Sequence, residues 1–173
     1  MHIEQSQSQV TIKLSSRELS AKFLIGADGG NSLVRRHANI GVTGWRYNQS
    51  AMLINVKTEL PQQDITWQQF RPTGPVAFLP MAGNFASLVW YHHADEIRTL
   101  SHLSDEELTK QVMKEFPSKI GLIEVLNKGV FPLTRQHANQ YVHGRIVLVG
   151  DAAHTINPLA GQGVNLGLKD VAA

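Results

Sequence analysis

The segment from Gly144 to Asn165 constrains the fold of this chain more than any other. An unbroken apolar run, Ile146–Val149, is followed by Gly150 and Asp151 and then by a loop containing proline and glycine. Such a run is typical of a strand covered on both faces, and the loop leads into the start of a helix. A strand that delivers an aspartate beside a glycine-lined helix start can hold a polar cofactor against backbone N–H groups. The segment therefore predicts an α/β layer with a cofactor site at the end of a strand.

Several residues of this segment are candidates for contact with a cofactor. The Asp151 carboxylate can accept hydrogen bonds from ribityl-type hydroxyls, and the backbone around Pro158 can line a flat ring. The helix after Gly163 points its positive end at that ring and favours a developing anion there. We interpret His154 as a structural residue of the turn, because a role in proton transfer requires a suitable geometry first. The candidates are Gly150, Asp151, Pro158, Gly161, Gln162, Gly163 and Asn165.

A shorter motif lies at residues 25–35, where Asp28 follows an apolar segment and is itself followed by two glycines. Glycines let a backbone approach a phosphate closely. Ser32 is a suitable N-cap for a short helix that carries Arg35. Taken alone, the motif fits an ordinary turn between a strand and a helix better than a phosphate site, because short motifs produce many false matches.

The sequence between the two motifs has a β-rich pattern. Ser104 and Glu107 match a capping box for one helix, which Pro117 ends. Alternating apolar residues predict a hairpin over residues 9–26, and an antiparallel sheet of at least four strands over about residues 45–92. The segments expected as strands of the insert are 51–56, 66–70, 76–80, 85–91 and 130–133, with a turn at 62–64.

This order of elements predicts a chain that leaves an α/β layer, enters an antiparallel sheet and then returns to the layer. We assign residues 1–44 and 139–173 to a cofactor-binding domain. Residues 45–138 form a β-rich inserted domain with one helix.

Composition excludes several classes of protein. The 173 residues include no cysteine, which excludes a disulfide scaffold and a cysteine-based zinc site. No apolar run approaches the ~20 residues of a membrane span, and no secretory signal is visible. The net charge is +2 and the basic residues are scattered, so the sequence lacks the clustered basic patch expected of a protein that binds nucleic acid. His92 and His93 are neighbours on an expected strand and therefore face opposite sides, which argues against a shared metal ion.

The two motifs, in this order and separated by a β-rich insert, resemble the class A flavoprotein monooxygenases, the para-hydroxybenzoate hydroxylase-like group. Residues 150–167 and the insert segments 66–70, 74–80 and 86–91 narrow the resemblance to the ubiquinone-biosynthesis hydroxylases. The resemblance spans essentially the whole chain. It implies an α/β fold, α+β within this stretch, in which an FAD domain carries an inserted antiparallel substrate domain.

The resemblance also implies a reaction. FAD is the cofactor, NAD(P)H and O2 are co-substrates, and a polyprenyl benzoquinol ring is hydroxylated in ubiquinone biosynthesis without a metal. Asp28 and Arg35 then border both FAD and the approach of NAD(P)H, while the residues from Gly150 to Asn165 hold the ribityl chain and the ring. The insert should supply one wall of an apolar pocket, although the same residues can instead form the insert's own core. The candidates for this wall are Phe78, Leu79, Pro80, Val89 and Trp90.

The chain departs from the family in lacking a Gly-x-Gly-x-x-Gly unit, which holds the FAD pyrophosphate, and a C-terminal helical region. We therefore expect an internal fragment that binds FAD weakly or not at all, has no hydroxylase activity alone and can self-associate through exposed apolar surface. We expect the intact enzyme in the cytoplasm, in peripheral contact with the inner face of the membrane and with other ubiquinone-biosynthesis proteins. Two alternatives stay open: a flavin hydroxylase of another aromatic substrate, and a non-enzymatic binding module if the chain is complete.

Overall fold

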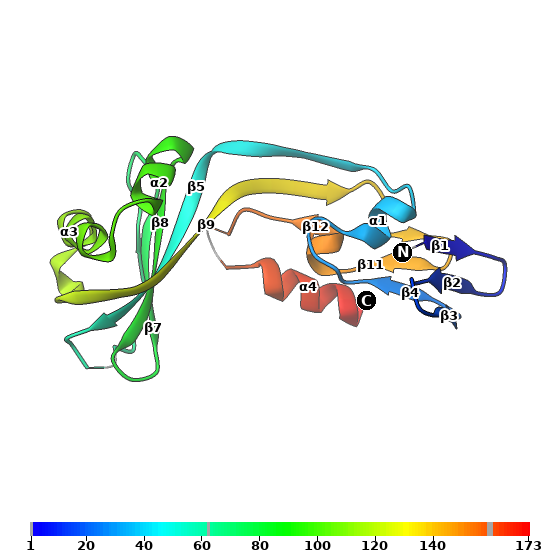
Figure 1. The fold of residues 1–173 in the computed structure, drawn as a ribbon, viewed down its shortest axis with the longest axis horizontal. Helices are drawn as coiled ribbons and strands as arrows, with labels where there is room; N and C mark the ends of the chain where they lie inside the picture. The colour runs from blue at the N-terminus through cyan, green and yellow to red at the C-terminus, as the bar shows by residue number, and fades with distance from the viewer. Residues whose placement is uncertain (1, 62, 159–160) are drawn as a thin grey trace. The chain divides into compact units, whose positions relative to one another are not determined.

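The computed structural model describes residues 2–61, 63–158 and 161–173, and the chain divides into two compact units (Figure 1). The turn expected at 62–64 includes Gln62, which lies outside the described residues. We call the first unit the split unit, because two separate segments build it, and the second the insert unit. The split unit comprises Met1–Arg46 and Thr134–Ala173, and the insert unit comprises Tyr47–Leu133.

The insert unit is built on an antiparallel sheet. Strand β5 (Val42–Thr58) pairs with β8 (Phe85–His93), β8 pairs with β7 (Val76–Met81), and β7 pairs with β6 (Trp67–Gln69). The four expected strands are therefore confirmed. Strand β5 and strand β9 (Ile123–Ala138) are much longer than their apolar segments, because backbone pairing continues where the side chains are polar.

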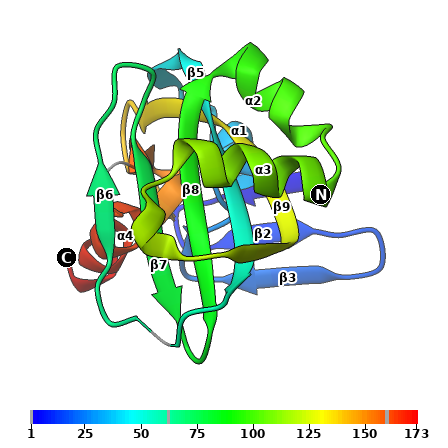
Figure 2. The same cartoon turned by 90° about the vertical axis from the view of Figure 1, so that its left-hand side faces the viewer.

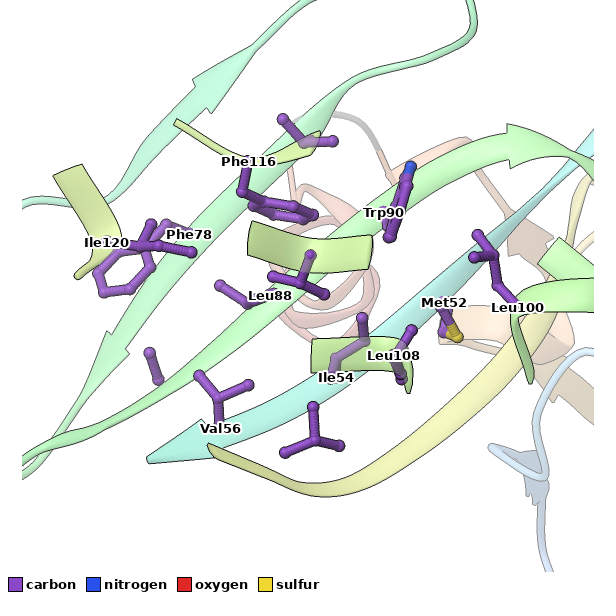
Figure 3. Close-up of a cluster of buried hydrophobic side chains, with 14 of the residues drawn as sticks. Met52, Ile54, Val56, Phe78, Leu88, Trp90, Leu100, Leu108, Phe116 and Ile120 are labelled. Carbon is purple, nitrogen blue, oxygen red and sulfur yellow. The ribbon is translucent and has the colours of Figure 1, made fainter. Parts of the chain in front are cut away.

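Helices α2 (Ala94–Ser101) and α3 (Asp105–Glu115) cover one face of this sheet (Figure 2). The expected capping box of α3 is confirmed: the Ser104 Oγ accepts from the Glu107 amide at 3.2 Å, and the Glu107 carboxylate accepts from the Ser104 amide at 2.9 Å. A short 3-10 helix, η1 (Ser118–Ile120), follows α3. Side chains from the strands and helices form one buried apolar cluster (Figure 3), which includes Met52, Ile54, Phe78, Leu88, Trp90, Ile97, Leu108, Val112 and Phe116.

Helix α2 corrects the expectation of a single helix in the insert. Strand β8 runs directly into α2, and the N-cap residue His93 makes no side-chain capping bond. Ile97 and Leu100 are the buried residues of this helix. Two buried positions and no cap give too weak a pattern to predict a helix from sequence.

The split unit contains two small sheets. Strands β1 (His2–Gln5), β2 (Val10–Lys13) and β3 (Glu18–Ala21) form an antiparallel meander. In the second sheet, β4 (Leu24–Gly26) pairs in parallel with β11 (Ile146–Leu148).

The hairpin expected over residues 9–26 is thus right only as far as Ala21. The Leu24 amide donates to the Arg145 carbonyl at 2.9 Å, which turns the chain into the second sheet. A Cβ at Gly26 would stand 2.9 Å from side-chain atoms of both Val34 and Leu148, so the glycine permits this close packing.

The remaining elements of the split unit surround β4 and β11. Both Ile146 and Leu148 are buried, whereas Val147 is half-buried, so β11 is fully covered on one face within the described residues. The other elements are β10 (Val142–His143), which pairs with β11, β12 (His154–Thr155), which pairs with the end of β9, and helices α1 (Leu33–His37), η2 (Gly150–Ala152) and α4 (Gly163–Ala172).

Candidate functional site

The turn at Asp28–Ser32 binds the start of helix α1. The Asp28 Oδ2 accepts from the amides of Leu33 at 2.7 Å and Val34 at 3.1 Å. The Ser32 Oγ accepts from the Arg35 amide at 2.9 Å and donates to the Asp28 Oδ1 at 2.5 Å. These bonds satisfy first-turn amides that a helix leaves without internal partners. Ser32 is therefore the N-cap, as the sequence predicts.

The same bonds determine the charge state of Asp28. Partial burial acts to raise the pKa of its carboxyl, but the hydrogen bonds from the Ser32 hydroxyl and from the amides of Val34 and Leu33 lower it further. The net pKa lies below the ordinary value. The carboxylate is thus ionised at neutral pH while it holds the helix start.

Arg35 joins the two sequence motifs. Its side chain is buried, with Nη1 donating to the Ala152 carbonyl at 2.8 Å and Nη2 donating to the Gly30 carbonyl at 2.8 Å. Gln136 donates to the same Gly30 carbonyl at 2.5 Å. The structure therefore gives Arg35 a bracing position between the Asp28 loop and the Asp151 turn. Direct contact of Asp28 or Arg35 with a cofactor stays a prediction.

The turn after β11 is open to a ligand. Gly150 has a φ of 59°, in the left-handed region that favours glycine, and a Cβ there would meet no atom within 4 Å. Asp151 is exposed on η2. The backbone can be approached closely at this point, and a carboxylate acceptor lies beside it.

The start of helix α4 is open as well. Its N-cap residue, Gln162, makes no side-chain capping bond, and a Cβ at Gly161 or Gly163 would meet no atom within 4 Å. Pro158 accepts a hydrogen bond from the Gly161 amide at 3.0 Å, which closes the loop before the helix. Asn165 is exposed in the first turn of α4.

These features fit the ribityl and ring portions of FAD. An exposed carboxylate suits hydroxyl donors, an uncapped helix start offers N–H donors to electronegative ring atoms, and glycine backbone leaves room for a flat ring. The residues that would hold these portions are Gly150, Asp151, Pro158, Gly161, Gln162, Gly163 and Asn165.

Sequence reasoning missed one residue at this site, Asp170. Its Oδ2 accepts from the Gly150 amide at 2.8 Å and lies 2.7 Å from the His154 Nε2. No local pattern in the sequence marks this contact, because the partners of Asp170 lie 20 and 16 residues earlier in the chain.

The five candidates for the substrate wall fall on different faces of the insert sheet. Phe78 and Trp90 belong to the cluster beneath the helices, which is the alternative core role that the sequence allowed for them. Strand alternation places Pro80, half-buried, on the same face as Phe78. Val89 is buried in a second cluster on the opposite face, and Leu79, also on that face, is 37% exposed. Substrate contact by any of the five stays a prediction.

Two further observations concern metal binding and membrane-spanning helices among the described residues. Among them, no group of three or more histidine, aspartate or glutamate side chains is placed to hold a metal ion. None of the helices within the described ranges is both long enough and apolar enough to cross a bilayer.

Comparison with known proteins extends this description. The family model of the FAD binding domain matches residues 2–173. The 3-demethoxyubiquinol 3-hydroxylase of Escherichia coli (strain K12) is 56% identical over 155 residues, covering 90% of this chain and 40% of that protein. The mitochondrial ubiquinone biosynthesis monooxygenase COQ6 of Rattus norvegicus is 34% identical, over 90% of this chain and 40% of the relative. The chain thus spans about 40% of the length of each of these relatives.

A solved structure shares the fold. The crystal structure of aklavinone-11 hydroxylase in a ternary complex with FAD and aklavinone matches with a TM-score of 0.70 at 23% identity. The match covers 99% of this chain and 34% of that one. With the family model matching nearly every residue, the chain belongs to the FAD binding domain family, in its para-hydroxybenzoate hydroxylase-like fold.

Proposed function

We propose that the protein to which this chain belongs is an FAD-dependent monooxygenase that hydroxylates a polyprenyl benzoquinol ring in ubiquinone biosynthesis. The observation that carries the proposal is the 56% identity to the E. coli 3-demethoxyubiquinol 3-hydroxylase over 90% of the chain. FAD, when bound, supplies the redox chemistry: with two electrons from NAD(P)H, one oxygen atom of O2 is added to the ring and the other is reduced to water.

The residues of the split unit have distinct tasks in this proposal. The exposed Asp151 carboxylate accepts hydrogen bonds from ribityl hydroxyls, and the start of α4 at Gly163 stabilises negative charge on the ring. Asp28 and Arg35 hold the loop and the turn that border the cofactor in fixed positions. No side chain of this chain is assigned a proton-transfer step.

An apolar substrate requires an apolar wall, and one face of the insert sheet offers it. Leu79, Met81 and Phe85 alternate with the residues beneath the helices, and they are 37%, 41% and 41% exposed. Val89 lies on the same face, in the second buried cluster. Exposed apolar side chains grouped in this way suit contact with a polyprenyl quinol. Leu79 and Val89 are therefore the favoured wall residues among the five candidates.

The test uses the full-length protein with bound FAD. A polyprenyl benzoquinol that lacks one ring hydroxyl should stimulate NAD(P)H oxidation and gain one oxygen atom, as followed by mass spectrometry. Asp151→Ala should weaken FAD binding, whereas Asp64→Ala, which changes an exposed aspartate of the insert unit, should not. Hydroxylation of a simple phenol in preference to the quinol, or absence of bound flavin, would contradict the proposal.

The location and partners follow from the substrate. A polyprenyl tail partitions into the bilayer, so the enzyme would work in the cytoplasm, in peripheral contact with the inner face of the membrane. Other ubiquinone-biosynthesis proteins would deliver and receive such a substrate. Co-sedimentation of the full-length protein with lipid vesicles that contain the quinol, compared with quinol-free vesicles, tests this contact.

A further inference from the structure

Helix α4 is attached to the rest of the split unit by a compact polar contact, which we call the Asp170 clamp. It consists of the Asp170 carboxylate, the Gly150 amide at 2.8 Å and the His154 Nε2 at 2.7 Å. The His154 side chain is 7% exposed and that of Asp170 is 17% exposed. The clamp therefore lies largely out of water, where hydrogen bonds to a charged acceptor are strong.

Apolar packing does not supply an equivalent attachment within the described residues. Helix α4 has no buried residue: its apolar side chain Leu166 is half-buried, and Val164, Leu168 and Val171 are 74%, 65% and 73% exposed. The helix instead touches the turn through its backbone: a Cβ at Gly167 would stand 3.2 Å from the Gly150 Cα. Gly167 and Asp170 are one turn apart, so the close approach and the clamp act on the same side of the helix.

His154 carries a feature that stability alone does not explain. Its Nε2 faces a carboxylate and so donates, which leaves Nδ1 as the acceptor in the neutral ring. This Nδ1 is buried and has no hydrogen-bond partner among the described residues. A buried polar atom without a partner is costly, so its presence points to a function that the His154–Asp170 bond serves.

A small aromatic group packs beside the clamp. The Tyr141 ring lies 5.8 Å from the His154 ring, centroid to centroid. Burial, and then the charge of Asp170, raise the pKa of the Tyr141 hydroxyl. The His137 ring lies 5.2 Å from the Tyr141 ring and 6.4 Å from the His154 ring, centroid to centroid, so the three rings form one group.

We infer that Asp170 is a positioning residue: through Gly150 and His154 it fixes helix α4 so that the helix start at Gly163 lies correctly against the cofactor. The helix is a rigid rod over its ten residues, so holding its last turn orients its first turn. The Gly150 amide at the other end of the clamp begins the turn that carries Asp151. One carboxylate thereby sets the relative position of both parts of the cofactor site. The inference rests on the proposed function for the identity of that cofactor.

The test compares Asp170→Asn with Lys169→Gln, an exposed neighbour on the same helix, in the full-length protein. Asp170→Asn should raise the Kd for FAD about tenfold, the lower end of the loss seen when a group that orients the ligands of a metal ion is removed. It should make the flavin midpoint potential more negative, because a displaced helix start stabilises the reduced, anionic ring less. Amide hydrogen exchange at Gly150 and over residues 163–166 should become faster. Lys169→Gln should change none of these quantities.

His154→Asn removes one arm of the clamp and leaves the Gly150 bond, so it provides a milder second variant. The effects of Asp170→Asn and His154→Asn on the Kd for FAD should be less than additive in the double variant, because both act through one contact. A loss of thermal stability with unchanged FAD affinity, potential and first-turn exchange would overturn the inference and leave a merely structural contact. If the unsubstituted protein bound no FAD, the proposed function would fail, and exchange at residues 163–166 would still decide whether the clamp holds the helix start.

Discussion

The start of helix α1 depends on the carboxylate of one residue, Asp28. It accepts hydrogen bonds from the amides of Leu33 and Val34, and its folded pKa lies below the ordinary value of 3.8. Asp28→Asn should lower the unfolding free energy by about 1 kcal/mol at pH 7, the usual value of such a capping contact. Urea denaturation of both proteins measures the difference.

The pH dependence of this difference has a definite sign. A group with a depressed folded pKa contributes stability above its unfolded pKa and loses that contribution as the pH falls through its folded pKa. The gap between wild type and Asp28→Asn should therefore close below a pH of about 4. A gap of constant size down to pH 2.5 would show that the charge of Asp28 is not what holds the helix.

Arg35 is a second residue whose replacement should lower the stability of the protein, because its bonds reach outside helix α1. Arg35→Met leaves the Ala152 carbonyl without its donor, while the Gly30 carbonyl keeps Gln136. One buried acceptor left unsatisfied costs about 1–3 kcal/mol. Arg36→Met is the matched control, since the single bond of Arg36 to the Asn31 carbonyl is exposed. Equal thermal denaturation midpoints for the two variants would contradict the bracing position of Arg35.

Among the elements, strands β5 and β9 leave no room for a side chain at Gly44, which lies against Arg135 and Gln136. A Cβ at Gly44 would collide with the Arg135 carbonyl oxygen and stand 2.7 Å from the Gln136 Cα, both of which are backbone atoms. Gly44→Ala should therefore destabilise the protein by about 1–3 kcal/mol, as overpacking does. Gly129→Ala in the same pair of long strands is the control, because a Cβ there meets nothing within 4 Å. Equal unfolding free energies of the two variants, measured by chemical denaturation, would contradict the predicted collision at Gly44.

The elements also show why some of the fold could be predicted and some could not. Helix α3 was predictable, because a capping box, an apolar stripe and Pro117 all lie within one short segment. Strand β4 was placed in the wrong sheet, because its partner β11 is remote in sequence and no local pattern records that pairing. Helix α2 has too few buried residues to show a period. Local chemistry is thus readable from sequence, whereas pairing between distant segments is not.

The candidate cofactor site also divides into features that the sequence predicts and contacts between distant residues that it does not. The open glycines, Asp151 and the uncapped helix start were readable because they lie within one continuous segment. The contact of Asp170 with Gly150 and His154 was not, because it forms only when α4 folds back onto the turn. The second role of Arg35, as a donor to Ala152, spans 117 residues and was hidden for the same reason.

At the scale of the whole molecule, we predict that Phe78 and Leu79, on opposite faces of the insert sheet, differ in their effects on stability and on substrate binding. Phe78→Ala should cost about 3–5 kcal/mol of unfolding free energy, since its ring is buried beneath the helices. Leu79→Ala should change stability little and raise the KM of the full-length enzyme for the polyprenyl quinol. An unchanged KM for Leu79→Ala would remove Leu79 from the proposed wall.

The split unit has a consequence for how the protein is made. Its two segments, residues 1–46 and 134–173, enclose a continuous unit of residues 47–133. A ribosome delivers the insert unit as one uninterrupted length, whereas β4 and α1 must wait for β11 and the turn after it before they can close. Contacts between such distant segments are slow to form and leave apolar surface exposed meanwhile. Of the two units, the split unit should therefore fold after the insert unit during synthesis, and its unpaired segments are the ones that chaperones would have to protect meanwhile.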